Sequence, residues 1–164
     1  KMPLVIVGDA KNIGYYKEVC DRPDNIIATV SNATNLEDGS AQHIVDSVQE
    51  AVEEYRTSLH KAALGEIDKA RGANMLQTDL QEVYRSAFQG AGETLYVRRG
   101  YMQSAKIDEK AQTLSPANDA TTEGITDDAI GEIIEHVIHN GGEAVFMPQD
   151  IMGEDQPIAL VTRY

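Results

Sequence analysis

Short apolar runs, separated by stretches with helical spacing, follow one another along the chain and predict an α/β fold. The runs have the β-branched and aromatic content of strands, and they lie at residues 4–7, 25–30, 93–99, 143–148 and 157–164. Between them, apolar residues recur every three or four positions, which is typical of amphipathic helices. Helices that alternate with buried-type strands predict a sheet covered by helices on both sides.

The longest helical pattern begins after a turn-rich connector, "SNATNLEDGS" at residues 31–40. It predicts one helix over residues 42–70, roughly 28 residues or ~42 Å long. The connector is the best candidate boundary, so we expect a βαβ segment over residues 1–40 and a second α/β domain over residues 41–164.

Capping signals predict where two shorter helices begin and end. Thr78 and Gln81 fit a capping box, and Gly90 fits the end of that helix. Thr126 is the expected cap of a later helix, which ends at residues 140–142. Its buried face is expected to hold Ile130, Ile133, Ile134, Val137 and Ile138. Residues 103–114 fit a strand or a hairpin, and residues 115–124 fit a polar, mobile loop.

Charge narrows the class of partner. The chain has 27 acidic residues against 14 Lys and Arg, a formal charge of −13. A surface with this excess repels phosphate backbones and anionic lipid heads, so we expect no general nucleic-acid binding and no membrane binding. A protein partner fits the charge better.

The remaining global features fit a cytoplasmic protein. Cys20 is the single cysteine, so no intrachain disulfide is expected, and a small buried apolar residue is its simplest interpretation. No apolar stretch approaches the ~20 residues that span a bilayer, and no signal-peptide pattern opens the chain. The chain starts with Lys1 just before a strand, which predicts a piece of a longer protein.

The first strand leads through Gly8 and Asp9 to Gly14, a strand–glycine–helix junction that could bind phosphate. The segment lacks the Lys-Ser/Thr of a P-loop and does not match Gly-x-Gly-x-x-Gly. Asp9 would also repel a phosphate. A plain strand-to-helix turn is therefore the favoured interpretation, and a nucleotide-binding or enzymatic domain that uses this loop is kept as an alternative.

A metal site and a nucleophilic centre both find little support. His136 and His139 lie near Glu132 and Glu135, but the helical angle places all four opposite the isoleucines, on the solvated side. No Gly-x-Ser-x-Gly elbow occurs, and Cys20 has no local signature. We expect no metal, no cofactor and no catalytic residue.

One basic and aromatic cluster stands out: Arg98, Arg99 and Tyr101, around Gly100. It follows a predicted strand, where α/β sheets usually present functional groups. Guanidinium groups beside a ring are suited to contact RNA or an acidic protein. The alternative is a charge pair at the sheet edge that neutralises nearby acids. This cluster is the predicted binding site.

The order of segments then resembles a known family. A unit at 78–101 ("TDLQEVYRSAFQGAGETLYVRRGY"), a unit at 133–148 ("IIEHVIHNGGEAVFMP") and the closing "IALVTRY" resemble the C-terminal domain of the archaeal and eukaryotic release-factor family, which includes Pelota. The bacterial branch is the most similar. Residues 4–19 resemble the end of that family's central domain, and residues 43–64 resemble the helix that joins the two domains.

The resemblance implies a three-layer α/β/α sandwich like that of kink-turn-binding ribosomal proteins, in a factor that acts on ribosomes. It implies contacts with the ribosome or a translational GTPase in translation termination or ribosome rescue. Peptide release in the family depends on a Gly-Gly-Gln loop; here "NGGE" has Glu143 in the third place, in a different domain. The resemblance therefore implies a non-catalytic domain, and the acidic charge argues against kink-turn binding. A stress or scaffold module unrelated to ribosomes is the remaining alternative.

Overall fold

The computed structural model describes residues 2–31, 41–118 and 124–164. The chain divides into two compact units, residues 1–62 and 63–164. The long helix α2 (Ala41–Gly72) contributes to both units. Its length is close to the length expected from its apolar spacing. The proposed boundary segment, residues 32–40, lies outside the described residues, so the division into 1–40 and 41–164 stays a prediction.

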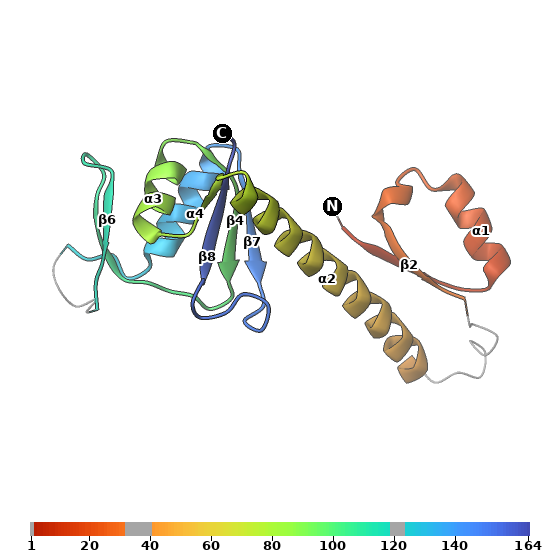
Figure 1. Cartoon of the computed structure of the whole chain (residues 1–164). Coiled ribbons are helices and arrows are strands. Elements are labelled where there is room, and N and C mark those ends of the chain that lie inside the picture. The colour runs from red at the N-terminus through yellow and green to blue at the C-terminus, as the bar shows by residue number, and fades with distance from the viewer. Residues whose placement is uncertain (1, 32–40, 119–123) are drawn as a thin grey trace. The chain divides into compact units, whose positions relative to one another are not determined.

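The first unit opens with the βαβ arrangement that the sequence predicts (Figure 1). Strand β1 (Leu4–Val7) pairs in parallel with β2 (Ile26–Val30), and helix α1 (Ala10–Val19) and the short 3-10 helix η1 (Pro23–Asn25) connect them. Parallel strands need such a crossover because a tight turn cannot join them. Cys20, just after α1, is half-buried rather than buried, and it is a free thiol.

The second unit is built on a four-stranded sheet in the order β3-β8-β4-β7. Its strands are β3 (Leu76–Gln77), β4 (Gly92–Arg98), β7 (Glu143–Met147) and β8 (Ile158–Thr162). Strand β4 runs parallel to β7 and antiparallel to β8. A separate hairpin, β5 (Ala105–Asp108) with β6 (Thr113–Pro116), settles the strand-or-hairpin alternative for residues 103–114. The α/β class is confirmed.

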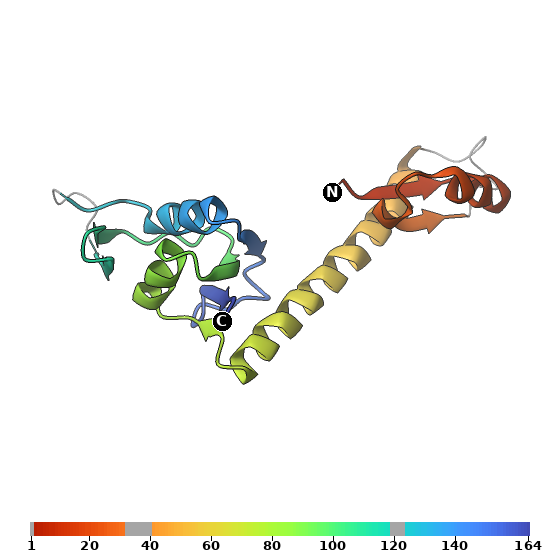
Figure 2. The same ribbon diagram turned by 90° about the horizontal axis from the view of Figure 1, so that it is seen from above.

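Successive residues of each strand pack against opposite faces of the sheet. On one face, Leu95 and Val97 join the core beneath α3 (Leu80–Phe88) and α4 (Ala129–His139). These two helices lie side by side (Figures 1 and 2). On the other face, Tyr96 joins the core that receives the last turns of α2. A full three-layer sandwich stays a prediction: in the described part of this unit, the second face is covered by the end of α2 together with Ile151 and Met152 of the loop after β7.

Both predicted caps are wrong by one or two residues. The Asp79 carboxylate, rather than the Thr78 hydroxyl, caps α3, and it accepts hydrogen bonds from the amides of Gln81 and Glu82 at 3.0 and 3.1 Å. The expected partner in a capping box, the Gln81 side chain, instead accepts a bond from the Leu114 amide at 2.7 Å and so holds the β5–β6 hairpin.

The same shift occurs at α4, which Asp128 caps through the amides of Ile130 and Gly131. Thr126, the predicted cap, exchanges backbone hydrogen bonds with Ala105. Ile138 was expected in the core but is 52% exposed, because the buried side of α4 is held by Ile130, Ile133 and Val137 and Ile138 lies about 100° around the helix from Val137.

No described helix is long and apolar enough to cross a membrane.

One hydrogen bond fastens the end of α2 to the sheet: the Tyr96 hydroxyl donates to the Glu66 carboxylate. Burial and this bond raise the pKa of Tyr96. The native state therefore keeps a proton that the unfolded chain releases above about pH 10, so the stabilisation is complete below that pH and is lost as pH rises further.

We therefore expect Tyr96→Phe to flatten the loss of stability at alkaline pH. Urea unfolding at pH 8 and pH 11 measures the difference for each variant. Tyr164→Phe is the matched control, since Tyr164 is 83% exposed and should behave as the wild type does. An unchanged pH slope in Tyr96→Phe would contradict the assignment.

Candidate protein-contact site at the end of strand β4

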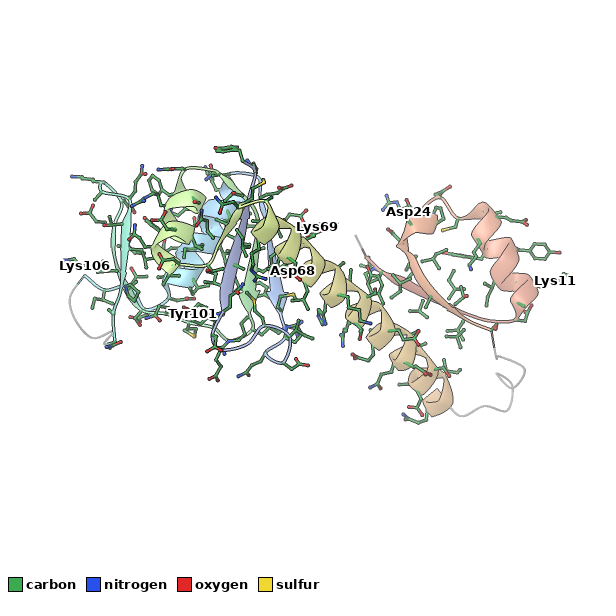
Figure 3. The ribbon with its side chains drawn as sticks, viewed as in Figure 1. Lys11, Asp24, Asp68, Lys69, Tyr101 and Lys106 are labelled. Atoms are coloured by element: carbon green, nitrogen blue, oxygen red, sulfur yellow. The ribbon has the colours of Figure 1, made fainter. Side chains whose placement is uncertain are left out.

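The candidate site lies where two parallel strands end. Strands β4 and β7 finish at Arg98 and Met147, and the Arg99 amide donates to the Met147 carbonyl at 2.8 Å. Carboxyl ends of parallel strands meet at one edge of a sheet, the usual place for functional groups in α/β folds. Figure 3 shows Tyr101 at this end of the strands.

Arg98 is held in place largely out of solvent. Its amide donates to the Pro157 carbonyl at 2.9 Å, which fixes the backbone, and its side chain is only 16% exposed. Among the described residues, neither Nε nor Nη1 of the guanidinium has a hydrogen-bond acceptor. Glu154 Oε1 lies 4.0 Å from Nη1, too far for a hydrogen bond, and this glutamate is 84% exposed.

A tight turn places an aromatic ring beside the guanidinium. Gly100 has φ +74°, a conformation that glycine adopts without strain, and the Tyr101 amide closes the turn on the Arg98 carbonyl at 3.0 Å. The Tyr101 ring then lies 5.8 Å from the guanidinium carbon, within cation–π range. Burial raises the pKa of the Tyr101 phenol, and the Arg98 charge lowers it in part. Arg99 is exposed.

The structure thus brings together Arg98 and Tyr101, with Arg99 at the surface next to them. The cluster lies at the end of a strand, as the sequence predicts. The alternative interpretation put a charge pair at the sheet edge, but β4 lies inside the sheet, between β8 and β7. Sequence reasoning missed Glu154 because it comes from a distant loop. Because Glu154 is exposed and too distant for a hydrogen bond, two donors of the Arg98 cation stay unsatisfied among the described residues. An unsatisfied buried polar group costs about 1–3 kcal/mol, and a charged group costs more.

The loop between β1 and α1, which the alternative interpretation makes a phosphate-binding site, does not suit an anion. The Asp9 carboxylate already accepts hydrogen bonds from the amides of Lys11 and Asn12, both at 3.0 Å, at the N-terminus of α1. Gly14 lies inside helix α1, whereas the nucleotide-binding alternative requires it in a loop. A negative charge on these amides disfavours the nucleotide interpretation.

One of the two histidines that were considered as metal ligands is less exposed to solvent than expected. His139 is exposed, but His136 is half-buried, and its ring stacks edge-on with Phe88 and Tyr84 at 5.0 and 5.8 Å between centroids. The prediction that both rings face solvent is wrong for His136, because α3 packs over that side of α4. Among the described residues, no three His, Cys, Asp or Glu side chains gather as a metal site would require.

Solved structures define the class of fold. Dom34 from S. cerevisiae, described as a translation termination-like factor that interacts with Hbs1, superposes with a TM-score of 0.59 at 15% identity over 99% of this chain and 46% of Dom34. Pelota from Archaeoglobus fulgidus gives 0.51 at 17% identity, over 99% of this chain and 49% of Pelota. The C-terminal domain of a peptide chain release factor from Methanosarcina mazei gives 0.52 at 13% identity, over 82% and 96%. The fold is that of release factors and Pelota.

A family model described as bacterial archaeo-eukaryotic release factor family 3 matches residues 1–91, and the chain belongs to this family. The resemblance drawn from the sequence, including its bacterial branch, is confirmed. The chain spans about half the length of Dom34 and Pelota. Comparison with curated protein sequences gives no match.

Proposed function

We propose that residues 41–164 form a non-catalytic docking module of a bacterial translation-termination or ribosome-rescue factor, which contacts the ribosome or a translational GTPase through Arg98, Arg99 and Tyr101. Family membership supports the translational role. The domain division and the cytoplasmic location predicted from the sequence are part of this proposal.

The observation that carries the proposal is the Arg98 guanidinium. The Arg98 side chain is only 16% exposed and its backbone is held by a hydrogen bond, yet two of its nitrogens lack acceptors among the described residues. Nε and Nη1 are themselves buried, so a partner carboxylate or phosphate that arrives at this end of the strands would contact the part of the guanidinium that is still exposed and pair its charge. The Tyr101 ring would add a flat, partly apolar contact, as interface tyrosines commonly do.

An acidic protein surface, such as one on a GTPase, fits better than bare RNA. The net charge of −13 opposes long-range attraction to a phosphate backbone. A single buried arginine instead recognises its partner at short range. This contact does not depend on long-range attraction between the two surfaces. The absence of Gly-Gly-Gln from the sequence supports a role without peptide hydrolysis.

The test is co-sedimentation of the full chain with ribosomes, with and without the translational GTPases of the cell. We expect Arg98→Ala combined with Arg99→Glu to weaken binding by about tenfold or more, as loss of a central interface arginine does. Arg56→Glu is the control, because Arg56 is an exposed arginine whose ion pair is with its helix neighbour Glu53. Equal sedimentation of all three proteins would reject the site, and no sedimentation of the wild type would reject the role.

A further inference from the structure

Strand β7 forms an open edge of the four-stranded sheet. It lies at one end of the order β3-β8-β4-β7, beside β4 (Figure 1). The strand at the other end, β3, has two residues and offers little backbone for pairing, whereas β7 has five. Proteins usually protect a sheet edge with a short strand, a charged residue, a proline or a bulge. Residues 144–147, Ala-Val-Phe-Met, contain no charge and no proline, and their register with β4 is regular.

The outward backbone groups of β7 belong to Ala144 and Phe146. The Arg99 amide donates to the Met147 carbonyl, so Met147 directs its backbone groups toward β4. Successive residues of a strand alternate in this respect, and Ala144 and Phe146 therefore direct theirs away from β4. Within the described ranges, no backbone group outside the sheet ladders bonds to either residue. This free edge presents two amides and two carbonyls with the spacing that another strand requires.

On the α4 side of the sheet, the free edge is apolar. Phe146 pairs in register with Val97, which packs beneath α4, so the Phe146 ring points to the same face. Helix α3 packs on β8, whereas α4 packs on β4 and β7 and turns His136 toward α3. Ile134 and Ile138 both lie about 160° around the helix from His136, on the flank at the free edge. Phe146 and Ile138 are each half exposed there.

On the opposite face, the free edge is acidic. A groove of about 450 Å³ lies there between the end of α2 and strands β4, β7 and β8. Glu66, Glu93 and Glu143 line it together with Lys69, so its charged side chains are negative in sum. All four are exposed, and Glu143 is the first residue of β7 itself. A basic side chain that approaches this face is therefore attracted.

We propose that the free edge of β7 binds an extended segment of a protein partner in which apolar residues alternate with lysine or arginine. The free backbone groups select a strand, whose successive side chains point to opposite faces. The α4 side then selects the apolar side chains, and the acidic groove selects the cations. A second copy of this chain would bring the same charge of −13, which disfavours it as the occupant. The proposal does not depend on the Arg98 site, because no residue is shared.

Hydrogen exchange of the full chain, followed by NMR, tests strand addition with the peptide acetyl-Lys-Val-Lys-Val-Lys-Val-amide. The amides of Ala144 and Phe146 should exchange at least about fivefold more slowly near saturation, because the peptide carbonyls accept from them. The amides of Val145 and Met147 point toward β4 and should change little. A peptide of the same composition without alternation, acetyl-Lys-Lys-Lys-Val-Val-Val-amide, should bind at least about fivefold more weakly.

Ile138→Lys and His139→Lys are a matched pair. Both side chains are exposed near the end of α4, but Ile138 lies on the flank at the free edge and His139 lies about 100° further around the helix. Ile138→Lys should weaken the alternating peptide at least about fivefold, and His139→Lys should not.

Glu143→Lys tests the acidic face. It should weaken binding of the Lys-Val peptide and strengthen binding of the acidic counterpart, acetyl-Glu-Val-Glu-Val-Glu-Val-amide, because the charge at the edge is reversed. The peptide assays contain no ribosome, so their outcome is separate from that of the co-sedimentation test.

Four results would contradict the proposal. Unchanged exchange of the Ala144 and Phe146 amides with the alternating peptide would show that no strand is added. Exchange that slows with the concentration of the chain alone would identify a second copy as the occupant. Equal binding of the alternating and non-alternating peptides would show that the two faces select nothing. Equal affinity of Ile138→Lys and His139→Lys would place the bound segment away from α4.

Discussion

Gly142→Ala is expected to lower the free energy of unfolding by about 3 kcal/mol, the upper range for overpacking a dense core. A Cβ at this position would lie 2.7 Å from Val137 Cγ1 and 2.9 Å from the carbonyl oxygens of Gly92 and Glu93. Two of these atoms are backbone of the central strand β4, so they cannot rotate away. The chain after α4 would have to move off the sheet.

Gly153→Ala is the matched control, because a Cβ there meets no atom within 4 Å. Its effect should stay within about 0.5 kcal/mol. Urea unfolding, followed by circular dichroism, measures both variants. Equal stability of the two proteins would show that α4 is not packed against β4 as described.

The Asn-Gly-Gly segment shows how far local sequence signals reach. Its glycines predicted the end of a helix, and Gly141 indeed adopts φ +77° there. The second glycine has another role, since Gly142 is needed for close approach to a strand fifty residues earlier. Turn chemistry is local and can be inferred from sequence. Close packing between distant segments cannot be inferred in that way.

Elements were predictable where one periodicity dominates. The long run of apolar residues along α2, the stripe of α4 and the β-branched content of β4 each identify a helix or strand without knowledge of its neighbours. The two-residue strand β3 was missed because it has no periodicity at all. Asp79 and Asp128 were missed as caps because several Ser, Thr and Asp residues near a helix start compete, and backbone geometry decides among them.

The candidate site residues also differ in how far the sequence could predict their surroundings. Arg98 and Tyr101 are three residues apart, so the sequence could group them as a basic and aromatic cluster. The burial of Arg98 could not be inferred, because it depends on β4 lying inside the sheet. Tyr84 and His136 are more than fifty residues apart, and a tyrosine on an apolar helix face is ordinarily a core residue. Their rings come into contact only when α3 and α4 are assembled.

The other large effect is expected from Leu160→Ala, which should cost about 2–5 kcal/mol, the range for removing a buried leucine side chain. Leu160 is fully buried near the middle of β8, the strand that joins β3 to β4. Its surroundings have no room to collapse: a Cβ added to Gly92 would lie only 3.0 Å from Leu160 Cδ1. The substitution therefore leaves a cavity under α3 and α4.

Phe146→Ala is the appropriate comparison, because Phe146 is also a large apolar residue of this sheet but is 51% exposed on the strand β7. It should cost less than half as much, since part of its ring already contacts water. Thermal and urea unfolding of both variants give the two costs. If Phe146→Ala is the more damaging change, β7 is covered in solution and β8 is not the centre of the core; if Leu160→Ala is, β8 supplies the centre of the core beneath α3 and α4.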